Sequence, residues 1–340
     1  MQRKDGGTER MLSRVAETLY WMSRYLERAE HTARLIDVCL HQMLDYTAAE
    51  EQPRWQRLRA SLSTVATDGE IDNSYGITKS LTFETSNTAS IGYAIAAARE
   101  NARQVRELIS SEMWEQLNRL YLQIKQTSVN ELWYAKPHVF FTSVKEGVQL
   151  FQGITDATMN HSEGWHFIRV GRFIERASAT AALLDVHFQA FFRSEEAEIQ
   201  AATNHLHYQG WVELLRSCAS FESYCKVYSA ADIQPERIAE FLLFNLESPR
   251  SICFAAGMLQ TALQSIARST QIRRAGRVER LAGRFRAGLQ YDQVEDVLQD
   301  VHAYLTNIQR QCGQIHDALD QTYMSYPIDI AVTERTSAQA

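Results

Sequence analysis

The chain has 340 residues, of which 45% are hydrophobic and 22% are charged, and its formal net charge is −6. This composition is typical of globular proteins and excludes a largely disordered chain. The negative balance argues against a general nucleic-acid-binding protein, whose affinity would come from neutralising phosphates. Because the chain has only 15 glycines and 5 prolines, long helices are favoured over a β architecture with many turns.

The five cysteines are odd in number and include no Cys-x-x-Cys pair. Reduced thiols fit this usage better than a disulfide framework or a zinc site. No apolar run approaches the ~18 residues that a membrane-spanning helix needs, and residues 1–10 lack the apolar core of a signal peptide. We therefore expect a cytoplasmic protein that binds neither nucleic acid nor membrane, with a disordered extension at 1–10 and a disordered tail at 327–340.

The chain predicts an all-α fold, a multi-helix antiparallel bundle. Prolines divide it into helices, since proline suits a first helical turn and disrupts an interior. Pro53 is expected to follow the first helix, and Ser143 with Glu146 resembles a capping box. Residues 67–86 are the least regular and are expected to admit strands. The predicted helices are 13–47, 54–66, 88–107, 111–134, 143–161, 164–193, 208–228, 235–246, 249–270, 277–288 and 292–322.

An internal repeat relates two of these helices. Residues 24–38 and 172–186 are identical at nine of fifteen positions, where about one identity is expected by chance. Around both segments, apolar residues recur at alternating intervals of three and four, which predicts an apolar face held over several turns. We expect these helices to lie side by side in one domain, 11–326, formed from two pseudo-repeats of about 11–160 and 161–326.

Charged residues also recur, on the side of each helix opposite its apolar face. They are Arg24, Glu27 and Arg28 in the first helix and Arg172, Glu175 and Arg176 in the second. A solvated face has no packing reason to repeat in this way, so we expect both helices to be covered on two sides. Glu27 and Glu175 should then be buried and paired with arginine, and the three- and four-residue spacing allows pairing along each helix.

Two interpretations of this cluster remain open. It is a buried ion-pair network that fixes helix register, or its surplus guanidinium groups bind a carboxylate or phosphate. With Arg250, five arginines face two glutamates, so either an anion or further acids (Glu30, Asp37, Glu163 and Asp185) must balance them. A helix starting at Pro249, with Ser248 as its N-cap, would add an anion-binding N-terminus. The candidate polar and anion-binding cluster comprises Arg24, Glu27, Arg28, Arg172, Glu175, Arg176, Arg250 and Ser251.

The sequence does not predict a metal or a bound cofactor. Glu163 and His166 have the Glu-x-x-His spacing of di-iron bundles, and Glu30 and His31 lie near Glu27, but a di-iron site needs two such motifs and two further glutamates. The repeat replaces Glu30 and His31 by serine and alanine. The chain has no P-loop, dinucleotide fingerprint or nucleophile elbow, and no catalytic residue is assigned.

Several segments together resemble the Alpha-E family of bacterial helical proteins, over nearly the whole chain from Met11. His31 and His166 do not belong to the family pattern. The segments that carry the resemblance are 11–14, 20–30, 98–103, 109–114, 163–177, 241–245 and 249–252.

The resemblance implies a partner. Alpha-E proteins are typically encoded with, or fused to, a circularly permuted ATP-grasp protein, often beside a transglutaminase-like protease. The leading expectation is therefore an accessory subunit of an ATP-grasp ligase in ATP-dependent amide or peptide bond formation, with ATP used by the partner. Two alternatives stay open: a stand-alone bundle enzyme that uses Glu27, Glu175 and Glu163 as acid–base or metal groups, and a purely structural scaffold.

Overall fold

The computed structural model describes residues 13–42, 48–62, 73–134, 137–195, 202–229, 232–270 and 276–325. All regular elements within these ranges are helical, which confirms the all-α prediction; the expected disorder at 1–10 and 327–340 lies outside them. In chain order the helices are α1 (Ser13–Gln42), α2 (Ala48–Ser61), α3 (Ser74–Phe83), α4 (Ile91–Gln104), α5 (Ser111–Gln126), α6 (Val129–Tyr134), α7 (Pro137–Thr158), α8 (Glu163–Glu195), α9 (Ala202–Ser217), α10 (Phe221–Val227), α11 (Pro235–Phe244), α12 (Ile252–Thr270), α13 (Gly276–Tyr291), α14 (Val294–Val297), α15 (Val301–Leu319) and the π-helix η2 (Asp320–Met324).

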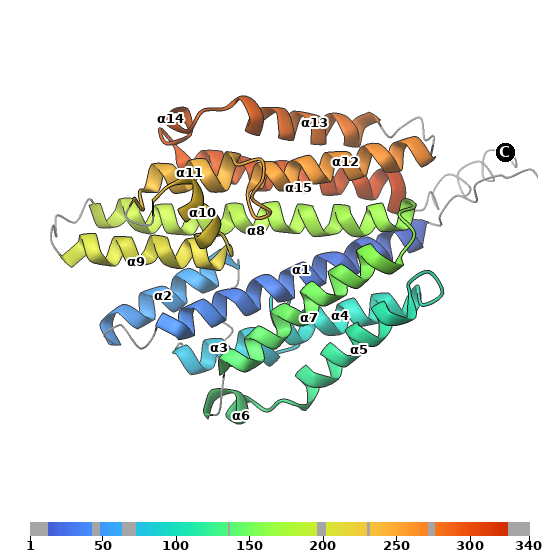
Figure 1. The fold of residues 1–340 in the computed structure, drawn as a ribbon, viewed down its shortest axis with the longest axis horizontal. Coiled ribbons are helices and arrows are strands. Elements are labelled where there is room, and N and C mark those ends of the chain that lie inside the picture. Colours follow the sequence, from blue (N-terminus) through green and yellow to red (C-terminus); the bar gives the residue numbers. More distant parts are fainter. Residues whose placement is uncertain are drawn as a thin grey trace, which may run out of the picture.

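The helices α1 and α8 pack directly against each other along the middle of the molecule (Figure 1). On one side α4 and α7 cover α1, and α5 packs across α4 and α7. On the other side α12 and α15 cover α8, and α13 packs across α12 and α15. The expectation that the two related helices are neighbours is therefore met. The order of helices is alike on the two sides, although the division into two pseudo-repeats stays a prediction.

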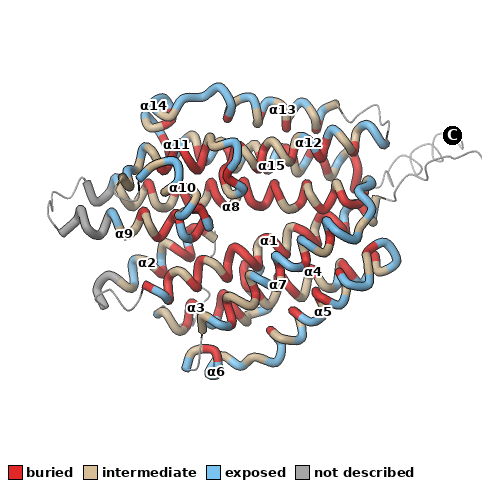
Figure 2. The backbone as a smooth tube through the Cα atoms, in the orientation of Figure 1, coloured by how far each residue is buried: buried red, intermediate tan, exposed pale blue. Residues whose placement is uncertain are grey.

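Burial is concentrated on the two central helices (Figure 2). Leu26 and Ile174 on their apolar faces belong to one hydrophobic core. Leu35 and Leu183, which lie on the opposite faces at equivalent positions, are also buried. Both helices are thus covered on two sides, as the repeated back faces indicated. No helix within the described ranges combines the length and the apolar character that crossing a membrane requires.

The helices α1 and α8 approach each other closely at small residues. A Cβ atom placed on Gly171 would lie 2.3 Å from the carbonyl oxygen of Tyr20 and 3.3 Å from the Cβ of Ser23. Ser23, which is 148 residues before Gly171, donates a hydrogen bond of 2.6 Å to the carbonyl oxygen of Ile168. Glycine is therefore required at this crossing because the backbone of the facing helix leaves no room for a Cβ atom. The backbone conformation of Gly171 does not itself require glycine.

Two residues that we expected to mark helix boundaries lie inside helices. Pro53 lies inside α2, which begins five residues earlier, and it does not separate two helices. Ser143 lies inside α7, which begins at Pro137. Its hydroxyl donates to the carbonyl oxygen of Phe140, so the expected capping box with Glu146 is wrong.

Other predicted elements are shorter or divided. The irregular segment 67–86 contains the helix α3 where it is described, and not a strand. The predicted helix 208–228 is interrupted after α9 because Ala219 adopts a left-handed backbone conformation with φ 49°, which ends a helix. The predicted helices 111–134 and 292–322 are likewise divided, into α5 and α6 and into α14, α15 and η2.

We predict that Gly171→Ala lowers the free energy of unfolding by at least about 2 kcal/mol, because the added methyl group must push the two backbones apart. Gly153→Ala is the matched control. Gly153 also lies inside a long helix, but a Cβ there meets nothing within 4 Å, so this change should be neutral or stabilise by about 0.5–1 kcal/mol. Urea denaturation of the two variants tests this, and equal stabilities would contradict the close approach.

Candidate functional site

Glu27 on α1 is buried against the middle of α8, with 1% of its surface exposed. Arg176 of α8 holds it in a bidentate pair, with Nε 2.6 Å from Oε1 and one terminal nitrogen 2.9 Å from Oε2. Arg250 donates to Oε1 at 3.1 Å, and the amide of Gln152 donates to Oε2 at 3.3 Å. Both carboxylate oxygens are therefore occupied by donors from outside α1.

Glu175 on α8 is held in a similar way by α1. The Nε atoms of Arg28 and Arg24 lie 2.7 Å from its two oxygens. Glu27 thus pairs with Arg176, while Glu175 pairs with Arg28. The glutamate of each Glu-Arg dipeptide therefore binds the arginine of the dipeptide on the other helix. Both glutamates are buried and paired with arginine, as expected. These pairs run between the helices, and not along each helix as the spacing would also have allowed.

Glu30 supplies a third carboxylate to the cluster. Its Oε2 accepts from Arg250 at 2.5 Å, and its Oε1 accepts from Arg34, one turn further along α1. Arg250 therefore bridges two buried glutamates, and its side chain is 13% exposed. Of the further acids that the sequence offered as balancing charges, Asp37 and Asp185 bind other residues and lie outside this cluster.

The segment before α12 is a turn and not the start of a helix. α12 begins at Ile252, so the N-cap is Ser251, and the expectation of an N-cap at Ser248 is wrong. The hydroxyl of Ser251 accepts from the amide of Phe254 and donates to the carbonyl oxygen of Asn245. The carbonyl oxygen of Pro249 accepts from Arg176 at 3.1 Å. Capping and the ion-pair network thus already use the groups that we expected to face an anion.

The arginines keep the three glutamates ionised. Burial by itself would raise the pKa of Glu27, but Arg176 and Arg250 outweigh it and the pKa is lowered. The same balance, set by Arg250 and Arg34, lowers the pKa of Glu30. Arg24 and Arg28 overcome the effect of burial on Glu175, whose pKa is also lowered. Carboxylates held in this way are poor proton donors, since a general acid needs a pKa near the working pH.

Arg172 does not take part in this exchange. By position it corresponds to Arg24, but both oxygens of Glu27 are already occupied by other donors. Its Nε is buried and has no hydrogen-bond partner among the described residues. Burial, followed by repulsion from Arg176, lowers its pKa to about 10, so the guanidinium is still charged at neutral pH and lacks a paired anion.

The residues considered for a metal are not brought together by the fold. Among the described residues, three side chains that could share one metal ion are Asp37, His41 and His138, and neither Glu163 nor His166 belongs to that group. His31 is buried, and its pKa is lowered to about 4 by burial and by the nearby Arg250. It is therefore neutral at physiological pH.

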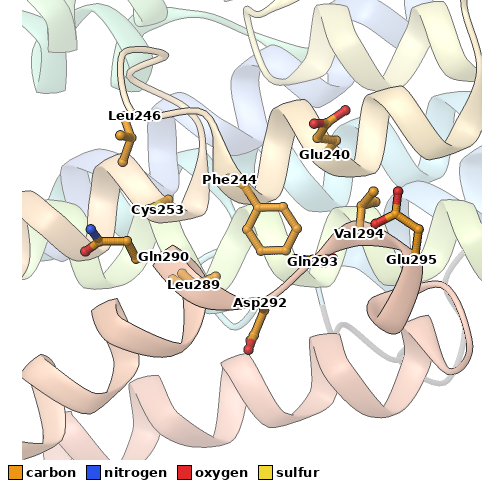
Figure 3. Close-up of a pocket in the computed structure, with 10 residues that line it drawn as sticks. All are labelled: Glu240, Phe244, Leu246, Cys253, Leu289, Gln290, Asp292, Gln293, Val294 and Glu295. Carbon is orange, nitrogen blue, oxygen red and sulfur yellow. The ribbon is translucent and has the colours of Figure 1, made fainter.

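A cavity of about 360 Å³ opens between α11, α12, α13 and α14 (Figure 3). Its polar lining includes the carboxylates of Glu240, Asp292 and Glu295, and no arginine or lysine of the described part of the chain lines it. Burial raises the pKa of the Cys253 thiol, which also lines this cavity, so the thiol is not an activated nucleophile. The cavity does not suit a carboxylate or phosphate ligand, and it is distinct from the arginine cluster.

Comparison with known proteins identifies the family. The family model for Alpha-E, described as a predicted alpha-helical domain with a conserved ER motif, matches residues 11–324. The chain belongs to the Alpha-E family. Curated relatives include the uncharacterised proteins Mb2597 of Mycobacterium bovis and Rv2567 of Mycobacterium tuberculosis, each 22% identical over 92% of this chain and 37% of the relative. The chain thus spans little more than a third of their length. No solved structure matches it significantly.

The Glu-Arg dipeptide that the family description mentions occurs several times in this Alpha-E chain. At 27–28 and 175–176 the dipeptides supply the buried, exchanged pairs between α1 and α8. Sequence repetition identified both of them. It did not identify Arg34 and Gln152, which have no counterpart of the same type 148 positions away. Glu30 also lacks such a counterpart and was a candidate only from the count of charges.

We predict that Glu27→Gln lowers the free energy of unfolding by about 3–5 kcal/mol, because it leaves Arg176 and Arg250 buried without their shared carboxylate. Glu100→Gln is the control, since it removes the same charge from an exposed pair with Arg103, and it should change stability little. Thermal and urea unfolding of both variants check this. A Glu27→Gln protein as stable as the control would show that the network does not stabilise the fold.

The stability of the protein should also fall at acid pH. The pKa values of Glu27, Glu30 and Glu175 lie below the ordinary value of 4.5. Their contribution is therefore complete above about pH 4.5 and is lost as the pH falls through the lower values of the folded state. Urea unfolding between pH 7 and pH 3 should show a decline below pH 4.5 that is smaller in Glu175→Gln. An identical decline in that variant would contradict this assignment.

Proposed function

We propose that this chain is an accessory subunit of an ATP-grasp ligase, in which it supports ATP-dependent amide or peptide bond formation without catalysing the reaction. Membership of the Alpha-E family supports this, through the association of the family with circularly permuted ATP-grasp proteins. ATP-grasp enzymes activate a carboxylate as an acyl phosphate and transfer it to an amine. The subunit would therefore work beside anionic substrates and intermediates.

The length of the relatives supports a role in a larger assembly. The region similar to this chain makes up 37% of each of the mycobacterial proteins. The remainder of those chains is additional sequence attached to the Alpha-E region. A helical unit that is joined to further sequence in relatives is suited to function in contact with another domain.

The observation that carries the non-catalytic part of the proposal is the saturation of the three buried glutamates. Glu27, Glu30 and Glu175 each accept from two or more donors, and their pKa values are lowered. Neither a general acid nor a general base with a pKa near neutrality results from such an arrangement. This favours an accessory role over the alternative of a stand-alone enzyme that uses Glu27 and Glu175.

Anion recognition is assigned in this proposal to Arg172 and its neighbour Arg169. Neither makes an ion pair among the described residues, and both guanidinium groups lie near the ring of Phe173, at 5.4 and 5.7 Å from its centroid. Burial lowers the pKa of Arg169 as well. Asp156, which attracts both guanidinium groups, accepts from the indole of Trp165 at 3.0 Å. A carboxylate or phosphate group from substrate or partner would supply the missing negative charge.

Mixing the protein with a circularly permuted ATP-grasp protein of the same organism tests the proposal. ATP consumption is followed with candidate carboxylic acids and amines, and complex formation is measured by size-exclusion chromatography with light scattering. We expect a stable complex and ATP use that depends on both proteins. Separate migration of the two proteins, with ATP use unaffected by this chain, would contradict the accessory role.

Arg172→Gln distinguishes recognition from docking in the same assay. This variant should still form the complex, while the KM for the acidic substrate rises about tenfold or more with the loss of a charged hydrogen bond. Arg103→Gln, which removes an exposed arginine paired with Glu100, is the control and should leave the KM unchanged. An unaltered KM for Arg172→Gln would remove Arg172 from the proposed recognition site.

A further inference from the structure

A second polar cluster lies where the last turns of α1 meet the start of α7. The buried carboxylate of Asp37 is its centre. Oδ1 of Asp37 lies 2.8 Å from Nδ1 of His138 and 3.4 Å from Nδ1 of His41. Oδ2 lies 2.5 Å from Nζ of Lys145. Asp37, His41 and His138 each offer one ligand atom, and these atoms lie within 4.8 Å of one another.

These separations suit a first-row transition-metal ion. Zinc binds imidazole nitrogen and carboxylate oxygen at about 2.0–2.2 Å, and in a tetrahedral site this puts neighbouring ligand atoms about 3.3 Å apart. The separations of 2.8 and 3.4 Å around Oδ1 lie on either side of that value. Nδ1 of His41 also lies 2.9 Å from the carbonyl oxygen of Asp37, and binding of a metal at this nitrogen would replace that hydrogen bond. The centroids of the two imidazole rings are only 3.4 Å apart, so both rings are already gathered beside the same carboxylate oxygen.

The chain contains a comparison for this cluster. Asp185 and Gln189 lie 148 residues after Asp37 and His41, and His302 is the second residue of α15 as His138 is of α7. Nδ1 of His302 lies 2.7 Å from Oδ1 of Asp185. The amide of Gln189 lies 3.0 Å from Oδ2 of Asp185 and 2.9 Å from Nδ1 of His302.

An aspartate–histidine contact thus joins α1 to α7 in the first cluster and α8 to α15 in the second. In the second cluster a glutamine occupies the position of His41. Packing therefore does not require a second imidazole. What distinguishes the first cluster is that His41 adds a third ligand of the kind that zinc, copper, nickel and cobalt prefer. Lys145 holds the other oxygen of Asp37, as outer-shell partners do for ligating carboxylates.

We propose that Asp37, His41 and His138 bind a divalent first-row transition-metal ion, for which Zn²⁺ is the best match. The side chain of His41 is 55% exposed, so the fourth coordination position is open to water or to a side chain of another protein. Mg²⁺ and Ca²⁺ are not expected to bind, because they prefer sites made only of oxygen ligands. Bound metal would fasten the end of α1 to the start of α7.

Titration of the untagged protein with ZnCl₂ and CoCl₂ tests this inference. We expect one equivalent of Zn²⁺ to bind in calorimetry and to raise the melting temperature, since the ion binds the folded state. Co²⁺ should give the visible absorption of a four-coordinate site. Failure of the protein to bind Zn²⁺ at micromolar concentration would overturn the inference.

His41→Gln is the decisive variant, because glutamine is accommodated at the equivalent position in the second cluster. It should fold with unchanged stability in the absence of metal and bind Zn²⁺ at least about tenfold more weakly, as loss of a group that supports a metal site typically does. His302→Gln is the control and should bind like the wild type. Equal affinity of His41→Gln and the wild type would overturn the proposal.

Gln189→His supplies a test by gain of function. It places a second histidine beside Asp185 and His302, so a second equivalent of Zn²⁺ should bind. If this variant still binds only one equivalent, the inference that the residue at this position makes the cluster a metal site is wrong.

Discussion

Glu27 and Glu175 are buried between the closely packed helices α1 and α8. The structure depends on the arginines of the opposite helix, which neutralise them. An uncompensated carboxylate in such a place costs several kcal/mol. Glu27 therefore requires Arg176, and Glu175 requires Arg28. Because the two pairs cross in opposite directions, sliding one helix along the other would break both of them. We therefore expect the exchange to set the register of α1 against α8, on which the outer helices pack.

The close approach at Gly171 belongs to the same constraint. The crossed pairs join long side chains, yet the backbones near Tyr20 and Ser23 are nearly in contact with α8. The pairs of Glu27 and Glu175 join the same two helices beyond this crossing. The small residue at the crossing and the charged residues beyond it therefore both belong to the contact between α1 and α8.

The sequence predicted the central helices because the repeat relates them. It predicted their buried glutamates because these recur on a face of each helix that the apolar pattern does not require. It did not predict which arginine meets which glutamate, since spacing along one helix is equally compatible with pairing within that helix. The starts of α2 and α7 were misplaced because proline alone does not locate a helix start: Pro53 lies inside α2, whereas Pro137 opens α7. Asp37 and His138 are 101 residues apart, and no periodic signal relates them, so that contact was not predicted.

The most direct measurement of the central claim is a double-mutant cycle between Glu27→Gln and Arg176→Met, with free energies of unfolding from urea denaturation. If the crossed pair holds α1 to α8, each single change removes the partner of a buried charge, and the double change removes both charges together. The account predicts a coupling energy of at least about 2 kcal/mol, within the range for buried charge pairs. A coupling energy below about 0.5 kcal/mol, the value typical of exposed pairs, would contradict it.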